Sequence, residues 1–494
     1  MKTALLEPLF TAAQTRAMDA AAIEGCGIPG SILMARAAQA CCEVMTAVWG
    51  QPSRVQVLCG TGNNGGDGYL IAHRLHQRGI PVQVLELGDS QKIQSDARKA
   101  RDLALDAGVP SVPYVDGCLE GDGILVDAML GTGLGGDVRP VYASAFEAVN
   151  AAGLPVLAVD VPSGLCADTG RILGSAVTAD ITVTFIALKR GLFTLDGPDC
   201  VGELEFADLA VPDTAHDCVA PDVWRLDLDT LLAELPPRPA TAHKGHCGSV
   251  LVIGGDEGMG GASLMAAEAA LRCGAGLVRL ATREQHVAAA IARIPEIMAH
   301  GVAGATDVRK LIDASDVLVV GPGLGQSEWS KACLQVALQA QKPCVLDADA
   351  LNVLASGDVQ SADLSDSVLT PHPGEAARLL GCAVGEIQTD RFAAATALTS
   401  KLGATVVLKG NGTLVASQKG IGLCDYGNPG MASGGMGDVL SGVLGALIAQ
   451  GLAADDAAPL GVCLHSAAAD IAALDGERGL LATDLIPVMR ELLD

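Results

Sequence analysis

A glycine-rich turn that leads directly into an apolar segment is the feature of this sequence that most constrains its fold. Residues 428–438 have the sequence Asn-Pro-Gly-Met-Ala-Ser-Gly-Gly-Met-Gly-Asp, and apolar residues dominate the positions up to Ala449. Within that segment, the apolar residues at helical spacing are Leu440, Val443, Leu444, Leu447 and Ile448. This periodicity predicts a buried helix that begins near Gly437. Because a helix start leaves backbone N–H groups without partners, its glycine-lined first turn is suited to binding a phosphate group.

Asp438 places a carboxyl group in this turn. An aspartate there could simply cap the helix. However, the small residues from Ser433 to Gly437 cost conformational entropy without filling a core, which favours a functional role. A carboxylate beside a transferable phosphoryl group can act as the general base for a substrate hydroxyl, so we predict that Asp438 is catalytic.

Length and composition favour an α/β protein of at least two domains. The 494 residues are 50% hydrophobic and include 60 glycines, with only 3% aromatic residues, so the cores must consist of small aliphatic side chains, as in buried parallel sheets. A net charge of −25 argues against nucleic acid or an anionic membrane as a partner. The 15 cysteines show no metal-binding spacing, and no segment is apolar enough for a signal peptide or a membrane span, so we expect a cytoplasmic protein.

In the N-terminal half, a buried strand over 55–59 ends at the turn 60–68, and a helix is expected from about Tyr69. A strand, a glycine-rich turn and a helix form a Rossmann-like unit that presents N–H groups to phosphate. Asn63, Asn64 and Asp67 add polar groups, which suggests recognition of a cation or of polar ring atoms as well. The alternative is a hairpin built on the Asn-Gly pair.

Further strands are expected at 82–87, 124–127, 156–161 and 181–185, and polar residues follow several of them. Ligands of an open parallel sheet bind beyond the carboxyl ends of its strands, so one crevice could collect the polar side chains there. These are Asp67, Asp127, Asp160, Ser163 and Lys189. Each acid could instead cap a helix.

Three of these stretches resemble motifs of the NAD(P)H-hydrate epimerase domain: Asn63-Asn-Gly-Gly-Asp67, Asp127-Ala-Met-Leu-Gly-Thr-Gly and Val159-Asp-Val-Pro-Ser-Gly164. The resemblance covers residues 1–215 and implies a potassium ion held by Asn64, Asp127 and Ser163, whose oxygen atoms suit a hard cation. It also implies that the hydrated dinucleotide is bound by Asn63, Asn64, Gly65, Gly66, Asp67, Gly131, Thr132, Gly133, Leu134, Gly135, Gly136, Asp137 and Asp160. The stretch Leu33-Met-Ala-Arg36 departs from the pattern, because many relatives have an acidic residue after the Leu-Met pair.

The chemistry of such a hydrate suggests roles for two residues. Its C6 atom carries a hydroxyl group and is bonded to the ring nitrogen, so the centre can lose and regain the hydroxyl or open and close the ring. Inversion needs a proton shuttle, for which we predict Asp160, with Lys189 nearby to orient it or balance its charge.

The C-terminal half repeats the alternation of strands and glycine-rich turns after a proline-rich stretch, 213–241, which we expect to be a linker or strap. Strands at 250–253, 317–320, 344–347, 368–370 and 405–409 each end at such a loop or at a polar one. His372 and Glu375 follow one of these strands, an unusual place for a core histidine, which favours a ligand role. Lys409 could neutralise a nucleotide phosphate or could be a solvated lysine.

Residues 224–494 resemble the ribokinase-like superfamily and, more narrowly, ADP-dependent NAD(P)H-hydrate dehydratases. The motifs that carry the resemblance are His243-Lys-Gly-His-Cys-Gly, Gly321-Pro-Gly-Leu-Gly, Pro371-His-Pro-Gly-Glu and Gly434-Gly-Met-Gly-Asp438. It implies that the hydrate contacts Ala262, Gly323, His372 and Asp438. It implies that the adenine nucleotide contacts Lys409, Gly410, Asn411, Gly412, Thr413 and Gly437. Glu375 is expected to help place Mg²⁺ through water.

Together these two resemblances imply a bifunctional enzyme with a Rossmann-like three-layer domain followed by a ribokinase-like α/β domain. The first domain would interconvert the R and S hydrates of NADH and NADPH, and the second would dehydrate the S form with ADP as co-substrate. A homo-oligomer is expected from the alanine-rich helices. Two alternatives remain: a kinase for a thiazole, pyrimidine or pyridoxal alcohol, and a module that binds nucleotides without turnover.

Overall fold

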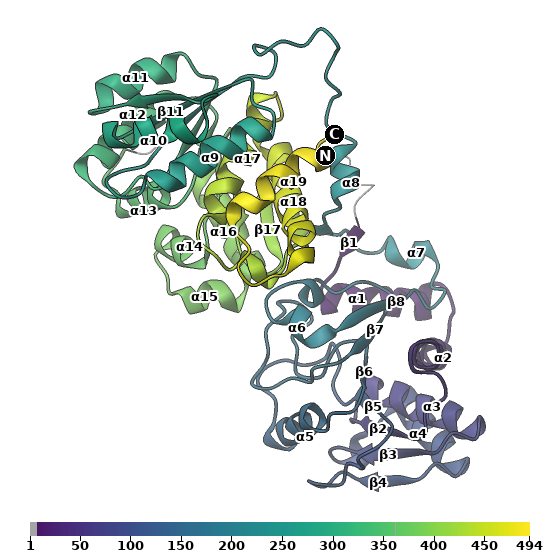
Figure 1. Ribbon diagram of the computed structural model, residues 1–494. Helices are drawn as coiled ribbons and strands as arrows, with labels where there is room; N and C mark the ends of the chain where they lie inside the picture. The colour runs from purple at the N-terminus through teal and green to yellow at the C-terminus, as the bar shows by residue number, and fades with distance from the viewer. Residues whose placement is uncertain (1–6, 361) are drawn as a thin grey trace. The chain divides into compact units, whose positions relative to one another are not determined.

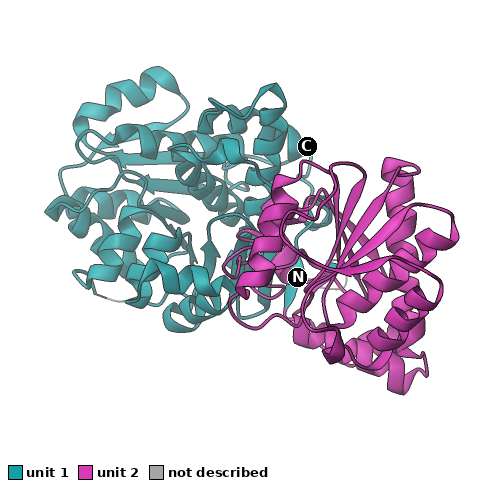
Figure 2. Cartoon of the chain, turned by 90° about the horizontal axis from the view of Figure 1, so that it is seen from below, with its two compact units in different colours: residues 1–7, 223–494 teal, residues 8–222 magenta. Residues whose placement is uncertain are grey.

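The computed structural model describes residues 7–360 and 362–494, which form two compact units (Figure 2). One unit comprises residues 8–222, and the other comprises residues 223–494 together with Glu7.

The N-terminal unit is built on a seven-stranded sheet whose strands are all parallel (Figure 1). The strand order is β4-β3-β2-β5-β6-β7-β8, so the direction of winding reverses between β2 and β5. The strands are β2 (Val55–Cys59), β3 (Val82–Glu86), β4 (Ser111–Pro113), β5 (Ile124–Ala128), β6 (Val156–Val159), β7 (Ile181–Phe185) and β8 (Glu203–Ala207). Such a reversal leaves a crevice at the carboxyl ends of the two strands, where ligands of open α/β sheets bind.

Helices cover both faces of this sheet. The main ones are α1 (Ala12–Ala20), α2 (Gly30–Trp49), α3 (Asn63–Gln77), α4 (Ser95–Asp106) and α5 (Pro140–Ala151). Along β2, Val57 packs in a core cluster with α2, α3 and α4, whereas Leu58 packs in a second cluster with Tyr142 and Phe146 of α5. Alternate strand residues thus supply two cores, which confirms the predicted three-layer α/β architecture.

One boundary differs from the prediction. The helix expected from about Tyr69 begins at Asn63, so the glycine-rich turn forms the first turns of α3. These glycines allow close packing: a Cβ atom on Gly65 would lie 2.1 Å from the Gly60 carbonyl oxygen, and one on Gly68 would lie 2.6 Å from the Cβ of Ala128. Helix propensity alone disfavours glycine, so the sequence placed the helix start too late.

The C-terminal unit contains most of an eleven-stranded sheet with the order β1-β9-β18-β17-β16-β15-β14-β13-β10-β11-β12, in which β1 (Glu7–Leu9) is the edge strand. The pairs from β12 to β16 are parallel, and the pairs β16–β17 and β17–β18 are antiparallel. The other strands are β9 (Val223–Arg225), β10 (Ser249–Ile253), β11 (Leu277–Thr282), β12 (Met298–Gly301), β13 (Val317–Val320), β14 (Cys344–Leu346), β15 (Val368–Leu369), β16 (Thr405–Leu408), β17 (Thr413–Ser417) and β18 (Gly420–Cys424). Winding reverses between β10 and β13, so a second crevice is expected there.

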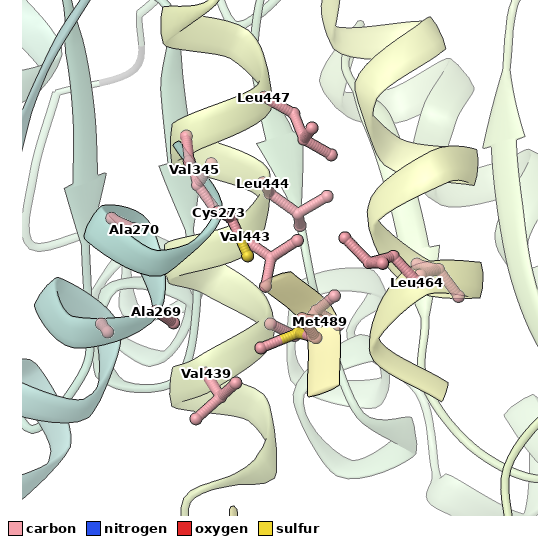
Figure 3. Packing of buried hydrophobic residues seen from close by; sticks show 14 of the residues in the cluster. Ala269, Ala270, Cys273, Val345, Val439, Val443, Leu444, Leu447, Leu464 and Met489 are labelled. Carbon is pink, nitrogen blue, oxygen red and sulfur yellow. The ribbon is translucent and has the colours of Figure 1, made fainter. Parts of the chain in front are cut away.

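The larger helices of this unit are α9 (Gly260–Arg272), α10 (Glu284–Arg293), α11 (Ala305–Asp313), α12 (Glu328–Gln339), α13 (Asp349–Ser356), α14 (Pro373–Leu380), α16 (Arg391–Leu402), α17 (Met436–Ala449), α18 (Ala454–Ala472) and α19 (Leu485–Leu492). The predicted buried helix is confirmed as α17. Figure 3 shows Val439, Val443, Leu444 and Leu447 of α17 among side chains of neighbouring elements. A Cβ atom on Gly442 would lie 2.1 Å from the Ala266 carbonyl oxygen, so α17 and α9 approach closely.

Two further features concern the expected linker and membrane segments. Part of the stretch 213–241 is ordered as β9, which pairs with β18, so that part is not a linker; three residues are too few for a periodic signal. Within the described residues, one helix, Ala454–Asp475, is long and apolar enough to cross a membrane, but 72% of its most apolar stretch is buried inside the protein, as in a core helix.

Candidate active sites

A cavity of about 770 Å³ opens at the carboxyl ends of the N-terminal strands. The predicted residues that line it are Asn63, Asn64, Asp67, Gly131, Thr132, Gly133, Leu134, Gly135, Gly136, Asp137, Asp160 and Lys189. Gly65 and Gly66 lie buried in the first turns of α3 beside it, and Asp127 and Ser163 are fully buried near its base. The structure therefore gathers these predicted residues beyond the carboxyl ends of β2, β5, β6 and β7.

Asp160 and Lys189 form a buried ion pair in this cavity. Asp160 directly follows β6 and has a φ of 69°, a left-handed conformation that non-glycine residues rarely adopt. The Lys189 side chain is fully buried, and its Nζ donates to Asp160 Oδ1 at 2.5 Å, to Thr184 Oγ1 at 3.0 Å and to the Phe185 carbonyl at 2.8 Å. These three hydrogen bonds hold the Lys189 side chain in place, and the first of them fixes the position of the Asp160 carboxylate.

Two more carboxyl groups face the same cavity. Burial raises the pKa of Asp67 well above its usual value, and the charges of Asp160 and Asp19 act in the same direction. Burial and the Asp160 charge also raise the pKa of Asp19, which belongs to α1. The sequence analysis missed Asp19, because a single acid in an amphipathic helix carries no motif. Its only sequence signal is its place on the same helical face as Thr15 and Arg16, which also line the cavity.

An oxygen-rich cluster lies where β5 and β6 end. Ser163 Oγ donates to Asp127 Oδ1 at 2.5 Å, and the Ser163 N–H donates to Asp127 Oδ2 at 2.7 Å. Burial raises the pKa of Asp127 to about 6, against which the hydrogen bonds from Ser163 act. Asn64 Nδ2 donates to the Leu130 carbonyl at 3.1 Å, which leaves Asn64 Oδ1 buried without a hydrogen-bond partner among the described residues. An orphaned buried carbonyl oxygen is what a bound cation would satisfy.

In the C-terminal unit, Asp438 lies in the first turn of α17, after Gly435 in a left-handed conformation with a φ of 99°. Burial raises the pKa of Asp438 to about 7, and the charges of Asp347 and Asp349 act in the same direction while that of Lys409 opposes it. This carboxyl group therefore titrates near neutral pH, where a general base is most effective.

Asp347 links Lys409 and Ser441 beside that turn. It follows β14 and is fully buried; its carboxylate accepts from Lys409 Nζ at 2.8 Å and from Ser441 Oγ at 2.9 Å. A Cβ atom on Gly437 would lie 3.1 Å from Lys409 Nζ, so the lysine ammonium group packs directly against the glycine turn. The structure thus brings Lys409, Gly437 and Asp438 together, with the lysine paired to an acid that the sequence analysis did not assign.

His372 and Glu375 have a structural relation that the sequence did not reveal. His372 is the N-cap of α14: its ring Nδ1 accepts from the Gly374 N–H at 3.0 Å. Glu375 Oε2 accepts from the His372 N–H at 2.9 Å, and Oε1 lies 3.3 Å from His372 Nε2. Burial raises the pKa of Glu375 to about 7. The capping box fixes the half-exposed imidazole at the carboxyl end of β15.

Two glycine-rich loops of the C-terminal unit lie against each other. The Asp256 N–H donates to the Gly323 carbonyl at 2.7 Å, and a Cβ atom on Gly323 would lie 3.1 Å from the Cβ of Ala262, so the predicted Ala262 and Gly323 are neighbours. Asp349 links this loop to the α17 turn, because its Oδ2 accepts from the Gly325 N–H at 2.8 Å and its charge acts on Asp438.

The loop of Lys409, Gly410, Asn411, Gly412 and Thr413 follows β16 and is supported by a buried arginine. Arg391 Nη2 donates to the Leu408 carbonyl at 3.1 Å and to the Gly412 carbonyl at 3.2 Å. Burial lowers the pKa of Arg391 to about 10. No motif marks this arginine, so the sequence analysis missed it.

Comparison with known proteins agrees with this division into two sites. A family model described as NAD(P)H-hydrate dehydratase matches residues 250–490, and one described as YjeF-related protein N-terminus matches residues 30–191. Solved structures similar to the C-terminal half include a hypothetical protein from Streptococcus mutans (TM-score 0.51, 31% identity, 55% of this chain and 100% of that one) and a ribokinase-like superfamily protein from Enterococcus faecalis (TM-score 0.52, 29% identity, 56% and 98%).

Curated relatives match along nearly the whole chain. The bifunctional NAD(P)H-hydrate repair enzyme of Coxiella burnetii is 46% identical over 98% of this chain and 99% of its own length. The enzyme of the same name from Escherichia coli is 43% identical over 94% of this chain and 89% of its own. The chain therefore belongs to the family of bifunctional NAD(P)H-hydrate repair enzymes.

Proposed function

We propose that the two units carry out successive repair reactions on one damaged cofactor. Residues 1–215 act as an isomerase that interconverts the R and S epimers of hydrated NADH and NADPH at C6. Residues 224–494 act as a lyase that dehydrates the S form at the expense of ADP. The observation that supports this proposal most directly is that each unit places an aspartate beside a glycine-rich backbone: Asp160 in the N-terminal cavity and Asp438 in the first turn of α17. The full-length similarity favours repair over the kinase and the binding module.

In the N-terminal site, the dinucleotide is proposed to lie along the cavity lined by Asn63, Asp67 and the Gly131–Asp137 loop. The residues present fit a potassium ion, because Asn64 Oδ1 is orphaned and Asp127 and Ser163 offer only oxygen atoms. Bound there, K⁺ would supply positive charge to the substrate's phosphate end. Asn64, Asp127 and Ser163 would hold it.

For the inversion itself, Asp160 is the proposed proton shuttle and Lys189 holds its carboxylate in place. Replacing Asp160 with Asn keeps the side-chain shape but removes the base, so epimerisation should fall by about 10²- to 10⁴-fold. Dehydration of the pure S epimer by the same full-length variant should persist, because that reaction uses the other unit. Epimerisation by Asp160→Asn at the wild-type rate would contradict the assignment.

In the C-terminal site, Asp438 takes the proton of the C6 hydroxyl, whose oxygen then attacks the terminal phosphoryl group of ADP and releases AMP. The N–H groups of the turn up to Gly437 stabilise the charge on the transferred group. Phosphate then leaves C6 with its bonding electrons, C5 loses a proton, and the ring double bond is restored. Ala262, Gly323 and His372 are proposed to hold the hydrate, and the loop Lys409–Thr413 the nucleotide.

Magnesium is proposed to accompany the nucleotide. Within the part of the chain that the structure describes, no group of three acidic, histidine or cysteine side chains is arranged to hold a metal ion. Both Glu375 carboxylate oxygens already face His372, so Glu375 would contact Mg²⁺ through a water molecule. The phosphates would supply the other ligands, as Mg²⁺ commonly requires.

One assay tests the whole proposal. The full-length protein is incubated with the mixed R and S hydrates of NADH, with and without ADP, and recovery of NADH absorbance is followed. We expect complete recovery with ADP, recovery of only the S fraction with Asp160→Asn, and none with Asp438→Asn. No recovery by the wild type with any nucleotide would refute the proposed function.

We further propose a cytoplasmic homo-oligomer that binds neither nucleic acid nor membrane, in keeping with the net charge of −25. Light scattering of the purified chain gives the oligomeric state, and a monomer at micromolar concentration would contradict this part.

A further inference from the structure

Carboxyl groups outnumber basic side chains among the residues that line the N-terminal cavity. Asp19 from α1, Asp67 from α3 and Asp160 after β6 all line it, and Lys189 is the cation bound to Asp160. The Lys189 ammonium group has its three donors engaged by Asp160, Thr184 and Phe185. Asp19 and Asp67 therefore share one cavity with an anion and have no lysine of their own.

The position of Asp19 is fixed by the start of α1. The Phe10 N–H donates to the Leu188 carbonyl at 2.9 Å, and the Arg190 N–H donates to the Phe10 carbonyl at 3.0 Å, so the chain before α1 pairs with the backbone on either side of Lys189. The Thr11 capping box then starts the helix. One face of α1, with Thr15, Arg16 and Asp19, is directed at the cavity.

Neither Asp19 nor Asp67 uses its carboxyl group in a structural contact. Among the described residues, the Asp19 and Asp67 side chains accept no hydrogen bond and form no ion pair. Besides Asp67, Asp160 and Lys189, the charged residues that line the cavity are Arg16, Asp96, Asp137 and Arg139. Of these, Arg16 Nη1 donates to the Thr132 carbonyl at 2.9 Å and Asp96 accepts from Lys99 at 2.8 Å.

Inversion at C6 requires two proton transfers of opposite sense. The departing hydroxyl must gain a proton, and the water that adds to the other face must lose one. A single ionised carboxylate cannot serve both steps at once. Two carboxyl groups whose surroundings separate their ionisation can do so, one as acid and one as base.

We propose that Asp19 is a catalytic residue of the epimerase site, the general acid that acts with Asp160 as general base. This inference rests on the proposed epimerase function. Asp19 gives its proton to the C6 hydroxyl, the C6–O bond breaks and its electron pair leaves with water, and the ring nitrogen lone pair forms the N1=C6 bond. Water then adds to the opposite face of C6, Asp160 takes its proton, and the nitrogen recovers its lone pair. A proton returns from Asp160 to Asp19 through water, so the cycle is balanced and reversible.

Asp19 suits this role better than Asp67. The charge of Lys189 lowers the pKa of Asp19 against the effects of burial and Asp160, whereas no cation is among the causes that raise the pKa of Asp67. A proton shuttle works best with a pKa near the working pH. Burial and the charges of Asp160 and Asp19 all raise the pKa of Asp67, and no neighbouring cation opposes them, so we assign Asp67 to substrate binding.

The test compares full-length Asp19→Asn and Asp67→Asn with the wild type, and measures epimerisation of the pure R hydrate by chromatography as a function of pH. We expect Asp19→Asn to lower kcat by about 10²- to 10⁴-fold with little change in KM, and to remove the alkaline limb of the kcat–pH profile. Asp67→Asn should chiefly raise KM and keep that limb. Glu24→Gln is the matched control, because Glu24 is an exposed acid one turn further on that does not line the cavity.

Two results would overturn the inference: an unchanged kcat for Asp19→Asn, or an alkaline limb that survives in Asp19→Asn and disappears in Asp67→Asn. Unimpaired dehydration of the S hydrate by each variant shows that the C-terminal unit is folded, and a KM for the R hydrate close to that of the wild type shows that the N-terminal unit of Asp19→Asn is folded. A wild-type protein that does not epimerise the R hydrate at all would instead refute the proposed function, and the inference with it.

Discussion

The buried carboxyl group of Asp438 should make the C-terminal unit less stable at high pH, and replacing it with Asn should remove that cost. The pKa of this group is about 7 in the folded protein, compared with 3.8 for an ordinary aspartate. Between these values the folded state binds a proton that the unfolded state has lost, so the free energy of unfolding falls as pH rises. The loss of stability caused by the Asp438 carboxylate is absent below about pH 4 and complete above about pH 7.

The size of the effect follows from the pKa difference. Three pKa units correspond to about 4 kcal/mol, and partial exposure of the side chain reduces this to about 2 kcal/mol. No hydrogen bond or ion pair to the Asp438 carboxyl is present among the described residues, so an Asn loses no specific partner there. We expect Asp438→Asn to exceed the wild type by less than about 1 kcal/mol at about pH 5 and by about 2 kcal/mol at about pH 8.5. Dehydratase activity should be lost.

Urea unfolding of the full chain measures this difference. In a Trp49→Phe background, the remaining tryptophans, Trp224 and Trp329, both lie in the C-terminal unit and report its unfolding by fluorescence. Asp313→Asn is the matched control, because Asp313 is an exposed acid of α11, and its stability difference should not depend on pH. An Asp438→Asn protein that is no more stable at about pH 8.5 than at about pH 5, relative to wild type, would refute the reasoning.

Three further predictions concern other parts of the two sites. Gly437→Ala places a Cβ atom 3.1 Å from Lys409 Nζ, so the KM for ADP should rise while stability changes by less than about 1 kcal/mol; a normal KM would show that the ammonium group can move aside. Arg391→Met removes the hydrogen bonds from Arg391 to the Leu408 and Gly412 carbonyls, which should lower the free energy of unfolding in urea by about 1–3 kcal/mol and weaken nucleotide binding in calorimetry. Asn64→Ala should abolish any activation of epimerisation by K⁺ over Na⁺, and activation that persists would place the ion elsewhere.

The sequence predicted the strands that lead into the site loops and most of those loops, but it did not predict β4, β8, β9, β11, β12, β17 or β18. Strands buried on both faces are short apolar runs, and at the crevice they end at glycines, so β2, β5 and β13 and the loops after them stand out. Helix starts were less visible. The glycines of α3 and of the turn before α9 permit close contacts that only the folded chain reveals, whereas propensity assigns them to turns.

The residues that the sequence did not assign share another property: each acts through contacts made by distant parts of the chain. Asp347 joins Lys409 to Ser441, Arg391 joins α16 to the loop after β16, and Asp19 reaches the cavity from a helix near the N-terminus. None lies in a glycine-rich motif. Their roles depend on tertiary placement, which neither periodicity nor spacing encodes.

The two aspartates proposed as catalytic, Asp160 and Asp438, have opposite environments, and the proposed reactions explain the difference. The Asp160 carboxylate accepts a hydrogen bond from the buried Lys189 Nζ at 2.5 Å, which holds it in place, as suits the shuttle proposed for it. Lys409, whose charge acts on Asp438, is instead bound by Asp347, and the pKa of the Asp438 carboxyl group is about 7. The arrival of a phosphoryl group at the N–H groups of α17 then changes the charge around Asp438, and removal of the hydroxyl proton is coupled to transfer of that group. Exchanging these environments, for example by freeing Lys409 with Asp347→Asn, should therefore lower the pKa read from the dehydratase pH profile, even where the chain remains folded.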